Sequence, residues 1–139
     1  MAQQETITVQ AAISASAGKA WQLYTEPKHI VKWNAASGDW HSPRAENNLK
    51  AGGTFNIRME AKDGSAGFDF TGVYDKVKEN ELIAYTMDDG RKVTVTFREI
   101  PEGTQVTVTF QAEATNPIEM QRNGWQSILN NFKKYVEGS

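Results

Sequence analysis

The sequence predicts an α+β fold in which a long C-terminal helix packs on an antiparallel β-sheet and encloses an apolar cavity with it. Two observations predict this fold. Between Arg44 and Ala114, short segments alternate apolar and polar residues and are separated by tight turns, as in a β-meander. From Asn116 onward, apolar residues recur at helical spacing along one face. This face must be buried, and the apolar face of the meander is the only large partner that the sequence offers.

The residues before the meander predict one strand and two short helices. Residues 7–11 alternate apolar and polar side chains, which indicates a strand with one buried face. A helix follows, with Ser14 or Ser16 as its N-cap. Pro27 suits the first turn of a second short helix. The pattern then breaks, and we expect a loop over residues 35–41.

The meander itself predicts about five strands. Residues 63–64, 88–90 and 101–103 contain glycine and mark turns, because glycine tolerates the positive φ that such turns require. Successive short turns make the neighbouring strands antiparallel, since parallel strands need long crossovers. With the N-terminal strand and a short one near residues 44–47, we expect a sheet of about six or seven strands.

The C-terminal helix is the clearest element. Asn116 is a candidate N-cap, Pro117 fits the first helical position, and Glu119 stands where the acid of a capping box belongs. At 100° per residue one apolar stripe forms. The stripe contains Ile118, Trp125, Ile128, Leu129, Phe132, Tyr135 and Val136.

Gly124 and Gln121 interrupt this stripe, and two interpretations stay open. In the first, Gly124 allows close backbone packing and Gln121 reaches the rim of the helix interface. In the second, this half of the helix faces a cavity, with Gln121 as a polar contact inside it. The C-terminal half of the helix is predicted to be ordinary core.

Composition narrows the class of protein. A length of 139 residues suits a single domain over residues 1–139. The absence of cysteine excludes a disulfide framework, a thiolate metal site and a cysteine nucleophile. The net charge of −2, without a basic cluster, argues against nucleic-acid binding. No signal-peptide pattern opens the sequence and no stretch of about 20 apolar residues occurs, so we expect a cytoplasmic protein without a membrane span.

Few residues suggest catalysis or metal binding. His29 and His41 lack metal-ligand spacing, and no nucleophile elbow is present, so we expect no metal and no cofactor. Asp69 lies between two phenylalanines, but alternation turns it to the opposite, solvated face. Glu60 lies on the solvated face of its own strand by the same argument. We therefore favour binding without catalysis.

The order of elements resembles the helix-grip (START-like, SRPBCC) superfamily and looks closest to homologues of the activator of the heat-shock-protein-90 ATPase. The resemblance rests on residues 21–33, 52–55, 63–65, 68–74, 89–91 and 124–136. It implies a sheet curved around the C-terminal helix, a cavity between them, and two short helices closing one end. Members of the superfamily include lipid carriers, hormone receptors, cyclases and co-chaperones, and the fold does not choose among these functions.

We expect a small hydrophobic or amphipathic molecule, such as a lipid, to bind between the sheet and the C-terminal helix. Ligand pockets are mainly aromatic or aliphatic with a few polar groups. The predicted contacts are Trp33, Trp40, Phe55, Phe70, Tyr74, Tyr85, Gln121, Gly124, Trp125 and Ile128. Two alternatives stay open: a cyclase or hydrolase acting on an aromatic or polyketide substrate, and a protein that interacts with a chaperone partner.

Overall fold

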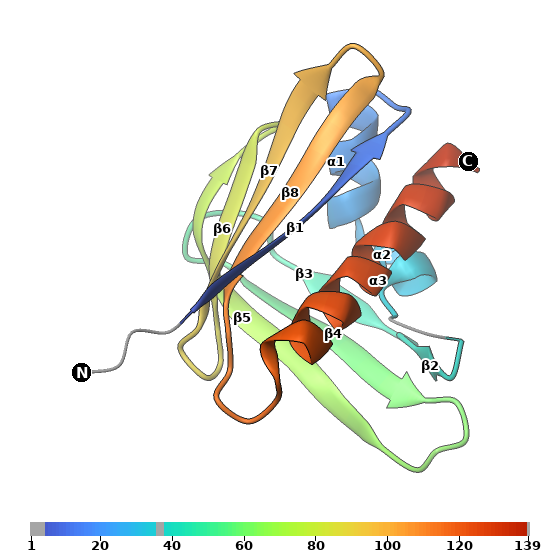
Figure 1. The fold of residues 1–139 in the computed structure, drawn as a ribbon, viewed down its shortest axis with the longest axis vertical. Helices are drawn as coiled ribbons and strands as arrows, with labels where there is room; N and C mark the ends of the chain where they lie inside the picture. The colour runs from blue at the N-terminus through green and yellow to red at the C-terminus, as the bar shows by residue number, and fades with distance from the viewer. Residues whose placement is uncertain (1–4, 36–37, 139) are drawn as a thin grey trace.

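The computed structural model describes residues 5–35 and 38–138 and has the predicted α+β architecture (Figure 1). The helices are α1 (Ala17–Thr25), α2 (Pro27–Trp33) and α3 (Ile118–Glu137). The strands are β1 (Thr6–Ile13), β2 (Trp40–His41), β3 (Ala45–Asn47), β4 (Thr54–Ala61), β5 (Gly67–Lys78), β6 (Leu82–Met87), β7 (Lys92–Ile100) and β8 (Gly103–Gln111). Helix α2 begins at Pro27, as predicted, because proline has a fixed φ and no N–H to lose.

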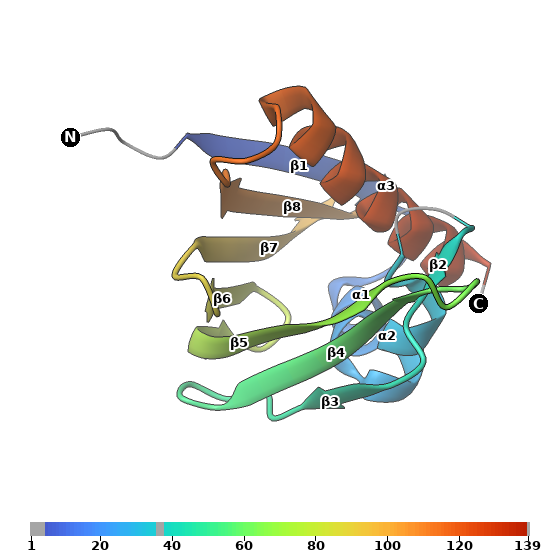
Figure 2. The same cartoon turned by 90° about the horizontal axis from the view of Figure 1, so that it is seen from below.

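One antiparallel sheet contains all eight strands, in the order β1-β8-β7-β6-β5-β4-β2, with β3 also paired to β4. Figure 2 shows the sheet as a curved wall, with α3 along one side and α1 and α2 at one end. The expected fold class is confirmed. Residues 40–41 were expected in a loop but form β2, so the sheet exceeds the expected strand number. Residues 36–37 of that expected loop lie outside the described residues.

Alternation along the strands produces the core. Inward-facing side chains such as Ile7 and Val9 on β1 and Val106 and Val108 on β8 are almost fully buried, while their neighbours are exposed or half-buried. On α3 the most deeply buried apolar side chains are Leu129, Phe132 and Val136. The C-terminal half of α3 is therefore core, as the stripe predicts.

Polar side chains of α3 hold the helix along the open edge of β1. Gln126 Nε2 donates to the backbone oxygen of Gln10 at 3.1 Å, and the Ser14 N–H donates to Glu137 Oε2 at 3.0 Å. These contacts satisfy backbone groups that an edge strand leaves unpaired. Helix α3 packs mainly against β1 and lies away from the far strands of the curved sheet (Figure 2).

The helix caps agree only in part with the sequence patterns. Ser16, one of the two candidates, caps α1, since its Oγ accepts from the Lys19 N–H at 3.2 Å. Asn116 does not cap α3: Pro117 is the N-cap residue and provides no side-chain hydrogen bond. The Asn116 amide instead donates to the Glu113 carboxylate in the preceding loop. The capping-box prediction is therefore wrong, because α3 begins one residue later than the pattern indicates.

None of the helices in the described ranges combines the length and the hydropathy that a membrane crossing requires.

Candidate functional site

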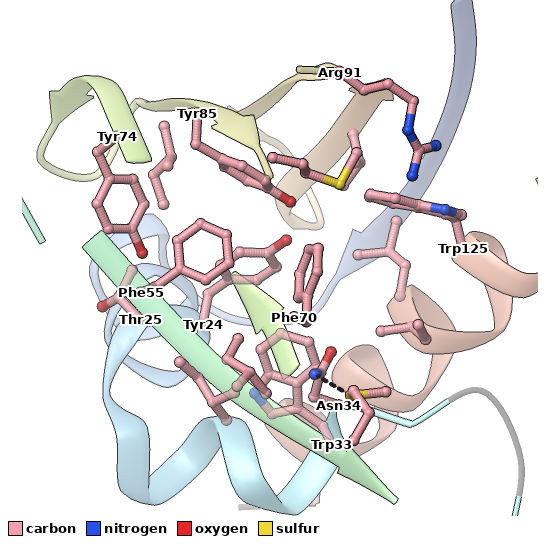
Figure 3. Close-up of a pocket in the computed structure, with 18 of the residues that line it drawn as sticks. Tyr24, Thr25, Trp33, Asn34, Phe55, Phe70, Tyr74, Tyr85, Arg91 and Trp125 are labelled. Atoms are coloured by element: carbon pink, nitrogen blue, oxygen red, sulfur yellow. Dashed lines mark hydrogen bonds between the residues drawn. The ribbon is translucent and has the colours of Figure 1, made fainter. Parts of the chain in front are cut away.

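A cavity of about 350 Å³ lies between the inner face of the sheet and the middle of α3 (Figure 3). Most of its lining is aliphatic or aromatic: Ile30, Trp33, Phe55, Ile57, Met59, Phe68, Phe70, Ile83, Met87, Val108, Trp125, Ile128 and Leu129. The polar members of the lining are Tyr24, Thr25, Asn34, Tyr74, Tyr85, Arg91 and Glu113. The site is thus an apolar chamber with a few polar groups, which is the usual composition of a small-molecule pocket.

The ring of Phe55 organises the wall formed by β4, β5 and β6. Its centroid lies 5.3 Å from that of Phe70, 5.4 Å from Tyr74 and 4.9 Å from Tyr85. Gly72 pairs with Phe55 across β4 and β5, and a Cβ at Gly72 would lie 2.6 Å from the Phe55 ring. The absence of a side chain at Gly72 therefore lets the ring lie flat on β5 and shapes the cavity.

Three aromatic rings close one end of the cavity. Tyr24 of α1, Trp33 of α2 and Phe132 of α3 have pairwise centroid distances of 4.9–5.0 Å. The Trp33 indole N–H donates to the Leu23 backbone oxygen at 2.9 Å, which fixes the orientation of the ring. These contacts join all three helices, so the two short helices form a packed end wall.

Trp125 forms part of the α3 wall. Its ring stacks on Phe110 of β8, with a centroid distance of 4.0 Å and an interplanar angle of 12°. Ile128 and Leu129 continue this wall toward the C-terminus of α3. The indole is therefore held against the sheet on one face while it lines the cavity.

Two tyrosine hydroxyls point into the cavity without a protein partner. Figure 3 shows the Tyr24 and Tyr85 hydroxyls directed toward the middle of the chamber, and neither makes a hydrogen bond with a described residue. Burial raises the pKa of both side chains above the ordinary tyrosine value. Both hydroxyls are therefore protonated near neutral pH and available as donors.

Two further hydroxyls of the lining are already engaged. Tyr74 Oη donates to Asn47 Oδ1 at 2.5 Å, and Thr25 Oγ1 donates to the Trp21 backbone oxygen at 2.8 Å. Burial raises the pKa of Tyr74, so this donor also stays protonated. These two groups support the wall and leave Tyr24 and Tyr85 as the free hydroxyl donors among the described lining residues.

Asn34 and Arg91 add an amide and a charge to the lining. Asn34 Nδ2 donates to Met59 Sδ at 3.0 Å, whereas its Oδ1 has no partner among the described residues. Arg91 lies at the edge of the chamber, where its Nε donates to Asp89 Oδ2 at 2.8 Å. The charge of Arg91 partly opposes the effect of burial on the pKa of Tyr85, which indicates that the two groups are neighbours.

The structure brings seven of the ten predicted site residues to the cavity. They are Trp33, Phe55, Phe70, Tyr74, Tyr85, Trp125 and Ile128. A ligand contact for each of them stays a prediction. The lining also contains Tyr24, Asn34 and Arg91, which the sequence reasoning missed. Arg91 belongs to the turn motif at residues 89–91 that contributed to the family resemblance, and this was the one signal available for it.

The other three predicted residues lie outside the cavity lining. Trp40 lines a separate surface depression near Lys134 and Tyr135. Gln121 is buried but binds the loop before α3, accepting from the Glu113 N–H at 2.9 Å. A side chain added at Gly124 would meet nothing within 4 Å, so close backbone packing does not explain this glycine.

The candidate acid and base residues do not line the cavity either. His41 Nε2 lies 3.8 Å from Glu60 Oε1, and Asp69 Oδ1 lies 3.5 Å from Arg58 Nη1. The His29 ring pairs with the Tyr135 hydroxyl at 2.6 Å, between α2 and α3. Within residues 5–35 and 38–138, no group of three or more His, Cys, Asp and Glu side chains is placed to hold a metal ion.

A curved antiparallel sheet and a long C-terminal helix, with an apolar-lined pocket between them, define a helix-grip domain. The family model described as "Activator of Hsp90 ATPase homolog 1-like protein" matches residues 14–137. The chain belongs to this family.

Solved structures agree with this assignment. The AHSA1-like protein from Aeromonas hydrophila is 45% identical, with a TM-score of 0.91 over 96% of this chain and 93% of that one. A protein from Cytophaga hutchinsonii is 51% identical, with a TM-score of 0.81 over 97% and 92% of the two chains. A protein from Chromobacterium violaceum shares the fold at 22% identity, with a TM-score of 0.86 over 96% and 98%. Curated proteins include no match to the sequence.

Proposed function

We propose that this protein binds a small, mainly apolar molecule in the cavity between the sheet and α3. The observation that carries the proposal is the set of free polar groups in an otherwise apolar chamber. Tyr24, Tyr85 and Asn34 each direct an oxygen toward the cavity, and none of these oxygens has a partner among the described residues. A ligand that fills the cavity covers these oxygens, and because buried polar groups are normally hydrogen-bonded, the favoured ligand carries matching polar atoms.

The dimensions of the chamber support a small molecule. Its volume of about 350 Å³ falls at the lower end of the range of about 300–1,000 Å³ that is typical of ligand pockets. Flat aromatic side chains on opposite walls, Phe55 and Phe70 on the sheet and Trp125 on α3, suit an aromatic or acyl body. The proposed ligand is therefore hydrophobic or amphipathic.

A neutral fluorescent naphthalene ketone, prodan, tests the proposal. We expect saturable binding to the unaltered protein and binding at least tenfold weaker to Ile128→Trp, since the larger side chain enters the cavity from α3. Met120→Trp is the matched control, because Met120 lies on the same helix, is 62% exposed and does not line the cavity. Circular dichroism shows whether both variants fold.

A thermal-shift panel of lipids, aromatic compounds and polyketides then searches for better ligands. A ligand at a hundredfold excess over its dissociation constant stabilises the folded protein by about 2.7 kcal/mol. The proposal fails if neither prodan nor any member of the panel binds. It also fails if Ile128→Trp binds prodan as tightly as Met120→Trp does.

A further inference from the structure

Arg91 is presented to the cavity as a fixed hydrogen-bond donor. It follows Gly90, whose φ of +89° turns the chain between β6 and β7. Its Nε donates to Asp89 Oδ2 at 2.8 Å and its Nη1 donates to the Gln111 backbone oxygen at 3.3 Å. These two contacts hold the plane of the guanidinium, whereas Nη2 has no partner among the described residues. The side chain is only 15% exposed and lines the cavity.

The neighbourhood of Arg91 contains a second free donor. The Tyr85 hydroxyl faces the same chamber and has no partner among the described residues. Tyr85 is 7% exposed, so its hydroxyl is removed from bulk water. The lining thus offers two free donors, one of them cationic, and such donors match a ligand with acceptor atoms and a negative charge.

The acidic side chains near Arg91 leave that position open. Asp89 occupies the Nε edge of the guanidinium and is 54% exposed, so the high dielectric constant of water weakens its repulsion of a ligand carboxylate. Glu113 also lines the cavity, but its carboxylate accepts from the Asn116 amide, and no ion pair joins it to Arg91 among the described residues. The Nη2 side of the guanidinium is therefore available to a ligand.

Building on the proposed function, we infer that the ligand is a carboxylic acid with an apolar body. Its carboxylate binds Arg91 Nη2 and the Tyr85 hydroxyl, and its apolar body lies between Phe55, Phe70 and Trp125. An aromatic acid and a fatty acid share this chemistry. A guanidinium suits a carboxylate because both groups are planar and the hydrogen bonds are charge-assisted.

Matched pairs of probes test the inference by isothermal titration calorimetry. The aromatic pair is naphthalene-2-carboxylate and its carboxamide, and the aliphatic pair is decanoate and decanamide. Each pair keeps the apolar body and removes only the charge. We expect the unaltered protein to bind at least one acid about tenfold to a hundredfold more tightly than its amide, which is the range for a hydrogen bond to a charged group. The pair that shows the preference identifies the aromatic or the acyl source.

Two variants assign the preference to Arg91. In Arg91→Gln the acid and the amide should bind with similar affinity. In Arg98→Gln, which removes the same charge from an exposed position on β7 outside the cavity lining, the preference should stay. An NMR titration of the unaltered protein does not depend on the folding of any variant: the Arg91 guanidinium resonances should shift with the acid and not with the amide.

Each outcome separates this inference from the proposed function. The inference is overturned if the amides bind as tightly as the acids or more tightly, if the preference persists in Arg91→Gln, or if the Arg91 resonances do not shift. In each of these cases, binding of prodan leaves the proposed function intact. Failure of the acids, the amides, prodan and the thermal-shift panel to bind overturns both.

Discussion

Gly72 allows the most direct test of how the cavity wall is built. The residue is buried in β5, opposite Phe55 of β4. A Cβ placed on it would lie 2.6 Å and 2.7 Å from two atoms of the Phe55 ring and 2.9 Å from the Thr86 backbone oxygen. All three distances are below van der Waals contact. In Gly72→Ala the Phe55 ring must therefore move, and the close approach to the Thr86 oxygen adds strain in the paired strand β6.

The magnitude follows from two opposing effects. Overpacking in a close-packed core costs about 1–3 kcal/mol. Replacing glycine by alanine stabilises the folded protein by about 0.4–1 kcal/mol, because the unfolded chain loses conformational freedom. We therefore expect Gly72→Ala to lower the free energy of unfolding by roughly 0.5–2 kcal/mol, which in a domain of this size lowers the melting temperature by about 2–8 °C. The displaced ring enters the adjacent cavity, so prodan should also bind more weakly.

Gly67→Ala is the matched control in the same strand. A Cβ at Gly67 would approach Arg58 Nη2 to 2.6 Å, but this atom is the far end of a flexible, half-buried side chain, and Gly67 itself is exposed. We expect no loss of stability, and a small gain from the restricted unfolded chain. Urea unfolding and thermal melts of both variants give the comparison. Equal stability of the two variants, with prodan affinity unchanged in Gly72→Ala, would refute the account of the wall.

Two further predictions concern the helix caps and alkaline pH. Ser16→Ala should lower the free energy of unfolding in urea by about 1 kcal/mol, the usual cost of losing an N-cap. Asn116→Ala should cost clearly less, because that side chain caps no helix. Equal losses in the two variants would contradict this assignment. Tyr24, Tyr74 and Tyr85 have folded-state pKa values raised by burial, so stability should be retained below the unfolded value of about 10 and decline as the pH rises above it. Absorbance of the phenolate form, recorded with unfolding, checks this: ionisation of these tyrosines before the protein unfolds would disprove it.

The elements that sequence patterns predicted correctly depend on neighbours in the chain. Strand alternation, glycine turns and Pro27 act over a few residues, and the apolar stripe of α3 repeats within one helix. These patterns were enough for the α+β class, the antiparallel order and the buried half of α3. They also selected most of the aromatic lining, because large apolar side chains on inward positions of β4, β5 and β6 must meet across the curved sheet.

The features that local patterns did not reveal depend on contacts between distant segments. Strand β2 has two residues, too few for a periodic pattern, and exists because Trp40 and His41 pair with the end of β4. The stripe left Gln121 with two interpretations, at the rim of the helix interface or inside the cavity, and the structure gives it backbone partners in the loop before α3 at 2.8–3.2 Å. Neither the pairing of β2 with β4 nor the hydrogen bonds of Gln121 can be predicted from the spacing of residues nearby in the sequence.

The sequence by itself therefore determined the class of fold and the apolar character of the space beneath α3, since both follow from local periodicity and the need to bury apolar surface. Only the tertiary structure decided which polar groups face that space. Tyr24 comes from α1, Asn34 follows α2, and Tyr85 and Arg91 come from either side of the turn between β6 and β7. Their convergence depends on the curvature of the sheet and the position of α3 along β1, which are set by long-range pairing that no local pattern encodes.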